Sequence, residues 1–291
     1  MKTVAFLENQ YSLLIFLLIN IKNKKDIKIY RETDIDKSSK LKIWLFILKI
    51  IFKYNTVYGQ DHTAIGNKLL LAKNFILLED GLMNYKEKKD SKLKYYIKRI
   101  FLKKAILGQA SNVKKIYLTG LAPIPEEIAH KVEIINLKEL WNKKTLEEQN
   151  EILDIFSFDL NIKEKIKRRN MILFTQPLSE DGIITEKEKI ELYSKIIRKY
   201  DNEKLVIKKH PREKTDYKEI FNNILVIEES FPAEIFDFLD IKFEKIITIF
   251  STAALNLSQD INIDFYGTEV EDKLLRYFGS FENVMKRNSY L

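Results

Sequence analysis

The segment Lys208-Lys209-His210-Pro211 combines residue types that suit an anionic ligand. His210 follows the apolar run Leu205–Ile207, so we expect it at the end of a buried strand. Pro211 prevents that strand from continuing, because it lacks an N–H group and restricts the residue before it. An imidazole placed there can donate a hydrogen bond to a leaving phosphate and offset its growing charge. We therefore predict that His210 acts as a general acid. Strand residues alternate between faces, so at most one of the two lysines shares its side.

Two small hydroxyl residues, Ser251-Thr252, follow a second apolar run, Ile246–Ile249, and precede Ala253-Ala254. Hydroxyls and free N–H groups at the start of a helix can hold a phosphate. An ordinary helix N-cap explains the same pattern, and the two interpretations are compatible.

Carboxylates stand at two further strand ends, where they could serve as general bases. Glu79-Asp80-Gly81 ends one apolar run, and a polar loop after another contains Glu180 and Asp181. A carboxylate in a cleft can have a raised pKa and take up a proton. The structural alternatives are a strand-ending Asp-Gly turn and a solvated loop before a helix capped by Thr185 and Glu188.

Apolar strand-like runs alternate with helical patterns along the chain, an order typical of parallel sheets covered by helices. The clearest helices are Glu186–Tyr200 and Ala253–Ser258. Each polar motif lies at the carboxyl end of an expected strand, where ligands of such sheets bind. The expected strands are Val4–Leu7, Ile27–Tyr30, Thr56–Tyr58, Phe75–Leu78, Lys115–Leu118, Val132–Ile135, Met171–Phe174, Leu205–Lys208, Ile224–Ile227, Ile246–Ile249 and Ile263–Phe265.

A charged, helix-prone stretch, Trp141–Arg169, separates two halves of the chain. With 291 residues, the chain is long enough for two domains, each with its own core. We place the boundary within Asp159–Lys165, which gives an N-terminal domain of residues 1–160 and a C-terminal domain of residues 161–291. The expected fold class is α/β, with two Rossmann-like domains whose parallel sheets face a central cleft.

Composition excludes several classes of function. The chain has no cysteine and only three scattered histidines, so we expect neither thiolate chemistry nor a metal site. Its net charge of +8 comes from lysines spread along the sequence, without a zinc-finger, basic-zipper or RNP pattern, so we do not expect nucleic acid as a partner. Walker A, GxGxxG, GxSxG and HExxH motifs do not occur.

Three apolar segments raise the question of membrane contact. Tyr11–Ile21 is like the core of a signal peptide, but it is too short to span a bilayer and has only Lys2 before it, so we predict a buried helix in a βαβ unit. Lys40–Lys53 and Ser91–Leu107 combine apolar residues with lysines, as helices in a bilayer interface do. We prefer the alternative of a buried helix and a solvated surface helix, respectively.

With these motifs in this order, the chain resembles bacterial sialyltransferases of glycosyltransferase family 52, the lipooligosaccharide and capsule type. The resemblance rests on Glu79-Asp80-Gly81, His210-Pro211 and Ser251-Thr252, with Thr175-Gln176-Pro177 in support. It extends from about residue 3 to the late 270s. It implies a GT-B fold, CMP-sialic acid as the donor substrate, and inversion at the anomeric carbon without a metal or other cofactor.

The resemblance also implies roles for individual residues. His210 would protonate the departing CMP phosphate, which Ser251 and Thr252 would bind. Glu234 stands where related sialyltransferases place a carboxylate on the ribose hydroxyls of cytidine.

Two further positions, Thr175 and Gln176, would line the nucleotide pocket. The general base would be Asp80 or Asp181, since related families use either position. Glu180 is a third candidate, because the loop that carries it is longer than the family's pattern.

The resemblance implies transfer of sialic acid to a galactose-type hydroxyl of a cell-surface glycan. The expected partners are the nucleotide-sugar donor and the glycan acceptor. We expect a cytoplasmic protein, with peripheral contact to the inner face of the membrane and homodimerisation through Lys40–Lys53 as open alternatives. Rival functions are transfer of another sugar, such as glucose, and a non-enzymatic role in polysaccharide assembly.

Overall fold

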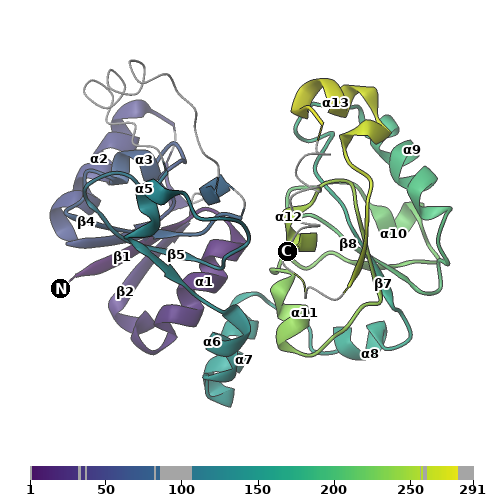
Figure 1. Ribbon diagram of the computed structural model, residues 1–291, viewed down its shortest axis with the longest axis horizontal. Coiled ribbons are helices and arrows are strands. Elements are labelled where there is room, and N and C mark those ends of the chain that lie inside the picture. The colour runs from purple at the N-terminus through teal and green to yellow at the C-terminus, as the bar shows by residue number, and fades with distance from the viewer. Residues whose placement is uncertain are drawn as a thin grey trace. The chain divides into compact units, whose positions relative to one another are not determined.

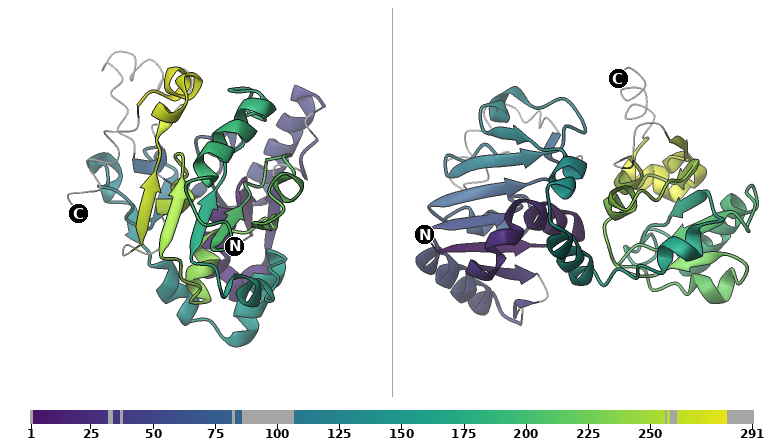
Figure 2. Two further views of the ribbon diagram at one scale, coloured as in Figure 1. Left: turned by 90° about the vertical axis from the view of Figure 1, so that its right-hand side faces the viewer. Right: turned by 90° about the horizontal axis from the view of Figure 1, so that it is seen from below.

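The computed structural model describes residues 2–31, 34–36, 38–81, 83–85, 107–255, 257 and 261–280. The chain forms two compact units, Met1–Leu153 and Asp154–Leu291 (Figure 1). The division lies within helix α7 (Leu146–Ile155), whereas the sequence suggested a boundary at residue 160. Each unit is a parallel sheet with helices packed on it (Figure 2).

The first unit contains a six-stranded parallel sheet of order β2-β1-β3-β4-β5-β6. Its order reverses between β1 and β3, which makes the carboxyl ends of these strands the expected place for a ligand. The strands are β1 (Thr3–Leu7), β2 (Ile27–Arg31), β3 (Thr56–Gly59), β4 (Asn74–Leu78), β5 (Val113–Leu118) and β6 (Val132–Ile134).

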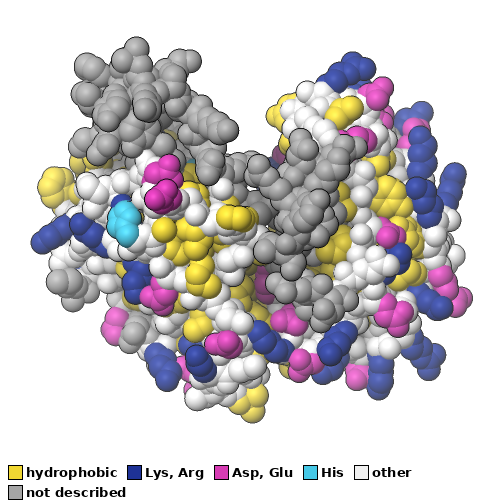
Figure 3. All heavy atoms as spheres, in the orientation of Figure 1, with side chains coloured by type: hydrophobic (Ala, Val, Ile, Leu, Met, Phe, Trp, Pro, Cys, Tyr) yellow, Lys and Arg dark blue, Asp and Glu magenta, His cyan; other side chains and the backbone are white. Residues whose placement is uncertain are grey.

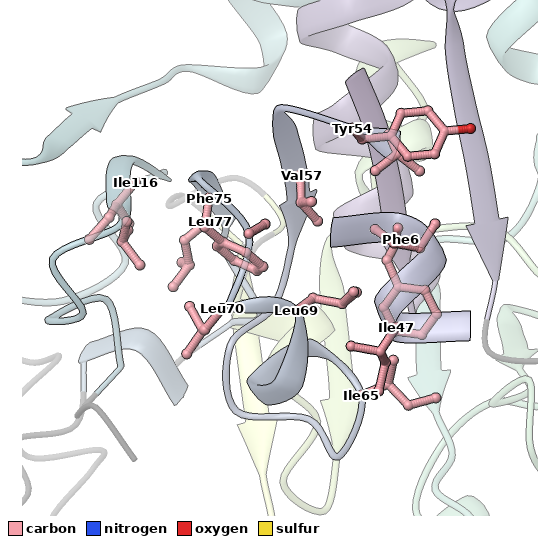
Figure 4. Close-up of a cluster of buried hydrophobic side chains, with 14 of the residues drawn as sticks. Phe6, Ile47, Tyr54, Val57, Ile65, Leu69, Leu70, Phe75, Leu77 and Ile116 are labelled. Atoms are coloured by element: carbon pink, nitrogen blue, oxygen red, sulfur yellow. The ribbon is translucent and has the colours of Figure 1, made fainter. Parts of the chain in front are cut away.

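Helices cover both faces of this sheet. Alternate strand residues such as Phe6 and Val57 face a buried cluster that includes Ile47 (Figure 4). The other face packs on α1, where the rings of Phe16 and Tyr58 meet edge to face at 5.3 Å. The helical segments of this unit are α1 (Gln10–Asn20), η1 (Ile21–Asp26), α2 (Lys40–Lys53), α3 (Gly66–Leu69), η3 (Met83–Tyr85), α5 (Glu126–Ala129), α6 (Leu137–Asn142) and α7.

The second unit contains a five-stranded parallel sheet of order β11-β10-β7-β8-β9. Here the order reverses between β7 and β10. The strands are β7 (Met171–Phe174), β8 (Leu205–Lys208), β9 (Leu225–Ile227), β10 (Lys245–Thr248) and β11 (Asn262–Phe265). The helical segments are α8 (Ile162–Ile166), α9 (Glu186–Ile197), α10 (Tyr217–Ile220), α11 (Glu234–Phe238), α12 (Thr252–Leu255), η4 (Thr268–Val270) and α13 (Asp272–Phe278).

Most local predictions from the sequence are confirmed. Every expected strand forms, with ends within two residues of those predicted. Tyr11–Ile21 is the buried helix of a βαβ unit, and the Thr185–Glu188 capping box opens α9. Within the described residues, no helix has both the length and the apolar character needed to cross a membrane.

The prediction for Lys40–Lys53 is wrong. This segment is a helix, but only Ile47 and Ile50 are buried, because α2 packs on the sheet through one face alone. The second lysine-rich segment, Ser91–Leu107, lies outside the described residues except for Leu107.

Gly66, the first residue of α3, lies where no side chain fits. A methyl group there would lie 1.8 Å from the carbonyl oxygen of Gln60 and 2.7 Å from Oγ1 of Thr63. We expect Gly66→Ala to lower the free energy of unfolding by about 2 kcal/mol or more, since the backbone must shift to relieve the overlap. Urea unfolding measures this change. Asn67→Ala, one residue later, is the matched control, and equal stability of the two variants would contradict the steric argument.

Candidate active site

Polar residues gather at the switch point of the first sheet. Asn9 follows β1, His62 lies three residues after β3, and Asp80 follows β4. The Asn9 side-chain amide donates to Oδ1 of Asp80 at 2.5 Å, and Nε2 of His62 lies 2.8 Å from Oδ2. These two contacts hold the Asp80 carboxylate in place. Because its side chain is 28% exposed, a ligand can still reach it.

The two acids of Glu79-Asp80-Gly81 have different surroundings. Glu79 is fully buried and accepts hydrogen bonds from the hydroxyls of Tyr11 and Tyr85 and from the backbone N–H of Thr119. Burial raises the pKa of Glu79, while these hydrogen bonds act in the opposite direction. Gly81 has a φ of 54°, a conformation that favours glycine. Glu79 thus fixes the strand end, and the chain then turns and leaves Asp80 accessible.

His62 is a site residue that the sequence analysis missed, because a lone histidine carried no signal until the fold brought it to Asp80. The hydrogen bond with Asp80 raises the pKa of His62, although burial opposes the shift. Within the described part of the chain, Nδ1 of His62 and the amide of the nearby Gln60 are buried without a hydrogen-bond partner.

At the switch point of the second sheet, residues after β7 meet residues after β10. Gln176 accepts a hydrogen bond from the backbone N–H of Phe250 at 3.2 Å and donates its own backbone N–H to the hydroxyl of Tyr193 at 2.8 Å. The next residue, Ser251, donates its backbone N–H to Oγ1 of Thr248 at 2.9 Å and directly precedes α12. The predicted nucleotide-pocket residues Gln176 and Ser251 are therefore brought to one place.

His210 lies just beyond β8, half-buried. Its Nδ1 accepts the backbone N–H of Arg212 at 3.1 Å, so the neutral imidazole carries its proton on Nε2. Burial, together with the positive charges of Arg212 and Lys208, lowers the pKa of His210 to about 4. At neutral pH the free protein therefore presents an uncharged Nε2–H donor rather than an imidazolium. An anionic ligand at this position would raise the pKa again.

A buried carboxylate, Glu213, holds this histidine segment in place. It accepts hydrogen bonds from the backbone N–H of His210 at 2.9 Å, from the hydroxyl of Tyr217 at 2.7 Å and from the hydroxyl of Thr175. Thr175 directly follows β7 and is only 3% exposed. Its hydrogen bond to Glu213 therefore links the end of β7 to the loop after β8 inside the protein. The sequence analysis missed Glu213. The only signal was its position three residues after His210, from which a side-chain carboxylate can accept the backbone N–H of His210.

The two lysines before His210 have their own contacts. Burial lowers the pKa of Lys208 to about 8, and its ammonium donates to the carbonyl oxygen of Glu229 at 2.8 Å beneath the ring of Phe231. Lys209 pairs with Glu228 at 3.7 Å. Both lysines are therefore engaged by neighbouring residues of the second unit at the end of β8.

Two adjacent carboxylates in the loop after β7 have unlike partners. Glu180 accepts from the fully buried ammonium of Lys189 at 2.8 Å and from the backbone N–H of Lys214 at 2.6 Å. Burial alone would raise the pKa of Glu180, but these hydrogen bonds lower it to about 2, which makes it a poor base. Asp181 accepts both guanidinium nitrogens of Arg212, at 2.5 and 3.1 Å. Through Arg212, Asp181 belongs to the same cluster as His210.

The remaining predicted residues lie on the same unit. Glu234 is the first residue of α11 and is 5% exposed. Thr252 begins α12, and its side chain lies outside what the structure describes. Of the predicted site residues, Asp80 alone belongs to the first unit.

Comparison with known proteins places the chain in a family. The family model for glycosyltransferase family 52 matches residues 7–274. The chain belongs to glycosyltransferase family 52. An uncharacterized protein of Haemophilus influenzae (strain ATCC 51907 / DSM 11121 / KW20 / Rd) is 42% identical over 308 residues, covering 97% of this chain and 99% of the relative.

Two solved structures share the fold of this family 52 protein. An α/β-galactoside α-2,3-sialyltransferase of Photobacterium phosphoreum has a TM-score of 0.65 at 14% identity, covering 98% of this chain and 96% of its own. A Photobacterium 2,6-sialyltransferase in complex with CMP and lactose also has a TM-score of 0.65 at 12% identity, covering 99% and 76%. At such identities the likeness concerns the fold, which is GT-B.

Two further features of this glycosyltransferase are the distribution of its surface charge and the grouping of its acidic and histidine side chains. On the face drawn in Figure 3, lysine and arginine side chains are interspersed with acidic ones over both units. Within the residues that the structure describes, no three His, Asp or Glu side chains lie close enough together to hold a metal ion.

The Glu180–Lys189 pair makes stability depend on pH. The pKa of Glu180 is lowered on folding, so its contribution is complete above the unfolded value of about 4.5 and is lost as the pH falls towards 2. At pH 7, we expect Glu180→Gln to lower the free energy of unfolding by about 3 kcal/mol, because the buried ammonium of Lys189 loses the nearest of its three carboxylate partners and keeps Glu186 at 3.1 Å and Glu213 at 3.8 Å. Urea unfolding at pH 7 and near pH 3 measures the difference, which should shrink in acid.

The exposed Glu203→Gln is the matched control for this pair and should be close to neutral at both pH values. A cost of Glu180→Gln that is the same at pH 7 and near pH 3 would contradict the assignment.

Proposed function

We propose that this glycosyltransferase moves sialic acid from CMP-sialic acid to a galactose-type hydroxyl of a cell-surface glycan, in lipooligosaccharide or capsule. Membership of family 52 supports a sugar transfer. The observation that carries the proposal is the Nε2–H donor of His210. This residue lies at the carboxyl end of β8, on the unit that also contains Gln176 and Ser251. Two proteins of the same fold are sialyltransferases, one of them solved with CMP and lactose.

In this mechanism His210 assists the leaving group. The bond between the anomeric carbon and the phosphate oxygen of CMP breaks, and negative charge grows on that oxygen. This charge raises the pKa of the adjacent imidazole and strengthens the hydrogen bond from Nε2–H. CMP leaves as a phosphate monoester, so one proton donor and neighbouring N–H and hydroxyl groups suffice without a cation. The carboxylate of sialic acid stabilises the oxocarbenium-like transition state.

The acceptor hydroxyl attacks the opposite face of the anomeric carbon, which inverts its configuration, and gives its proton to a base. Glu180 is disfavoured as that base, because Lys189 and a backbone N–H hold it with a pKa of about 2. Asp181 also pairs with a cation, but its partner Arg212 is 61% exposed and can turn aside for a substrate. The Lys189 that holds Glu180 is instead fully buried, so we favour Asp181 as the base. Asp80, held by Asn9 and His62, is the alternative.

The activity is tested by incubating the protein with CMP-sialic acid and a galactose-terminated acceptor. We expect a product one sialic acid heavier than the acceptor, with release of CMP, as measured by mass spectrometry. We expect His210→Ala to reduce turnover at least about a hundredfold, the usual contribution of general acid catalysis.

His130→Ala, at an exposed histidine, is the matched control for that variant and should retain wild-type turnover. Transfer of a different sugar in a screen of nucleotide-sugar donors would reassign the donor. Absence of both transfer and donor hydrolysis would favour a non-enzymatic role.

The identity of the base is tested by comparing Asp181→Asn with Asp80→Asn. Both substitutions preserve shape and remove the ability to accept a proton. We expect Asp181→Asn to lower kcat at least about a hundredfold, and Asp80→Asn chiefly to raise KM, because the base acts in the transition state. Initial rates over a range of acceptor concentrations separate the two effects. A larger loss of kcat in Asp80→Asn would move the base to the first unit.

A further inference from the structure

Helix α2 has a second apolar face that the core does not use. Its inward face carries Ile47 and Ile50, which are buried in the first unit. Its outward face carries five large apolar side chains at positions 41, 44, 45, 48 and 52, a helical spacing that places them in one stripe along the helix. Their exposed fractions are 67% for Leu41, 43% for Trp44, 57% for Leu45, 42% for Leu48 and 85% for Phe52.

Lysines flank this stripe on both sides. We call the stripe together with these lysines the α2 outer face. At 100° per residue, Lys42, Lys49 and Lys53 lie along one border and Lys40 along the other, and all four are exposed. The helix contains no acidic residue, although Lys42 pairs with Asp36 just before it. A lysine stem can lie along apolar surface while its ammonium reaches a polar layer.

We propose that the α2 outer face docks the protein on an anionic lipid surface, with the helix lying in the interface. The apolar stripe would enter the boundary between headgroups and acyl chains, and the lysines would contact the lipid phosphates. The helix has 14 residues, so it lies on a bilayer rather than crossing it. This inference rests on α2 alone and does not depend on the proposed activity.

Charge argues for lipid over a second copy of this chain as the occupant. A two-fold symmetric contact would pair the α2 outer face with itself. Lysines on both borders would then meet lysines of the other copy, and the helix has no acidic residue to offset them. An anionic bilayer supplies the opposite charge along both borders at once.

The test is flotation of the full chain with vesicles. We expect binding to vesicles of equimolar phosphatidylglycerol and phosphatidylcholine, and little binding to phosphatidylcholine alone. Trp44 provides a second readout, because the only other tryptophan, Trp141, is buried. In the Trp141→Phe background, the emission of Trp44 should shift to shorter wavelength when anionic vesicles are added.

Variants of exposed residues separate the apolar contribution from the ionic one. Leu45→Gln with Phe52→Gln should weaken partitioning at least about tenfold, since two apolar side chains no longer leave water. Lys49→Gln should weaken it about fivefold, and only at low salt. Leu146→Gln, at an apolar residue of α7 that is 73% exposed, is the matched control and should bind as the wild type does.

Any of three results would overturn the proposal. The first is the absence of flotation with anionic vesicles at low salt. The second is flotation that the double variant leaves unchanged. The third is a dimer of the wild type, measured by light scattering after size exclusion, that the double variant dissociates while vesicles bind neither protein.

Discussion

A buried carboxylate joins the carboxyl ends of neighbouring strands in each unit, and the arrangement of each site depends on it. Glu79 directly follows β4 and accepts hydrogen bonds from Thr119, which follows β5. Glu213 follows β8 and accepts one from Thr175, which follows β7. A carboxylate removed from water is costly unless several donors surround it, so each glutamate requires its partners in defined positions. The polar loops at these edges are therefore fixed.

The residue next to each of these contacts is the one that can meet a ligand. Asp80 follows Glu79 and stays partly exposed between Asn9 and His62. His210 donates its backbone N–H to Glu213, and its ring is held through Nδ1, which leaves Nε2–H as the available donor. The buried glutamates thus hold the backbone at these strand ends, and the neighbouring Asp80 and His210 each keep a polar group that a ligand can reach. This separation explains how a short acidic motif can contain one structural and one accessible carboxylate.

In the loop after β7, the buried charge that holds the chain in place is a cation rather than a carboxylate. Lys189 is fully buried on α9 and draws Glu180 inward, so the adjacent Asp181 turns to Arg212. Because Arg212 also contacts His210 through its backbone, the proposed acid and the proposed base share one neighbour. Burial and the positive charges of Arg212 and Lys208 lower the pKa of His210, so the free protein presents a neutral imidazole whose Nε2–H can donate to an anionic ligand.

Local pattern alone determined the strands, the buried helix α1, the capping box of α9 and the placement of His210 at a strand end. Periodicity, turn residues and caps are properties of a few consecutive residues, so a sequence displays them directly. Family membership could also be inferred from the order of short motifs. The pairing of His62 with Asp80, the role of Glu213 and the capture of Glu180 by Lys189 required the tertiary structure.

The same holds for the exposed stripe of α2. Its sequence is apolar on nearly all sides, and only the packing of Ile47 and Ile50 on the sheet decides which side chains stay in water. Each of these features joins residues that are distant along the chain or depends on how much of a surface a neighbour covers. Spacing in a sequence contains neither distance nor burial, and these two quantities set the pKa values and the accessible donors of the site.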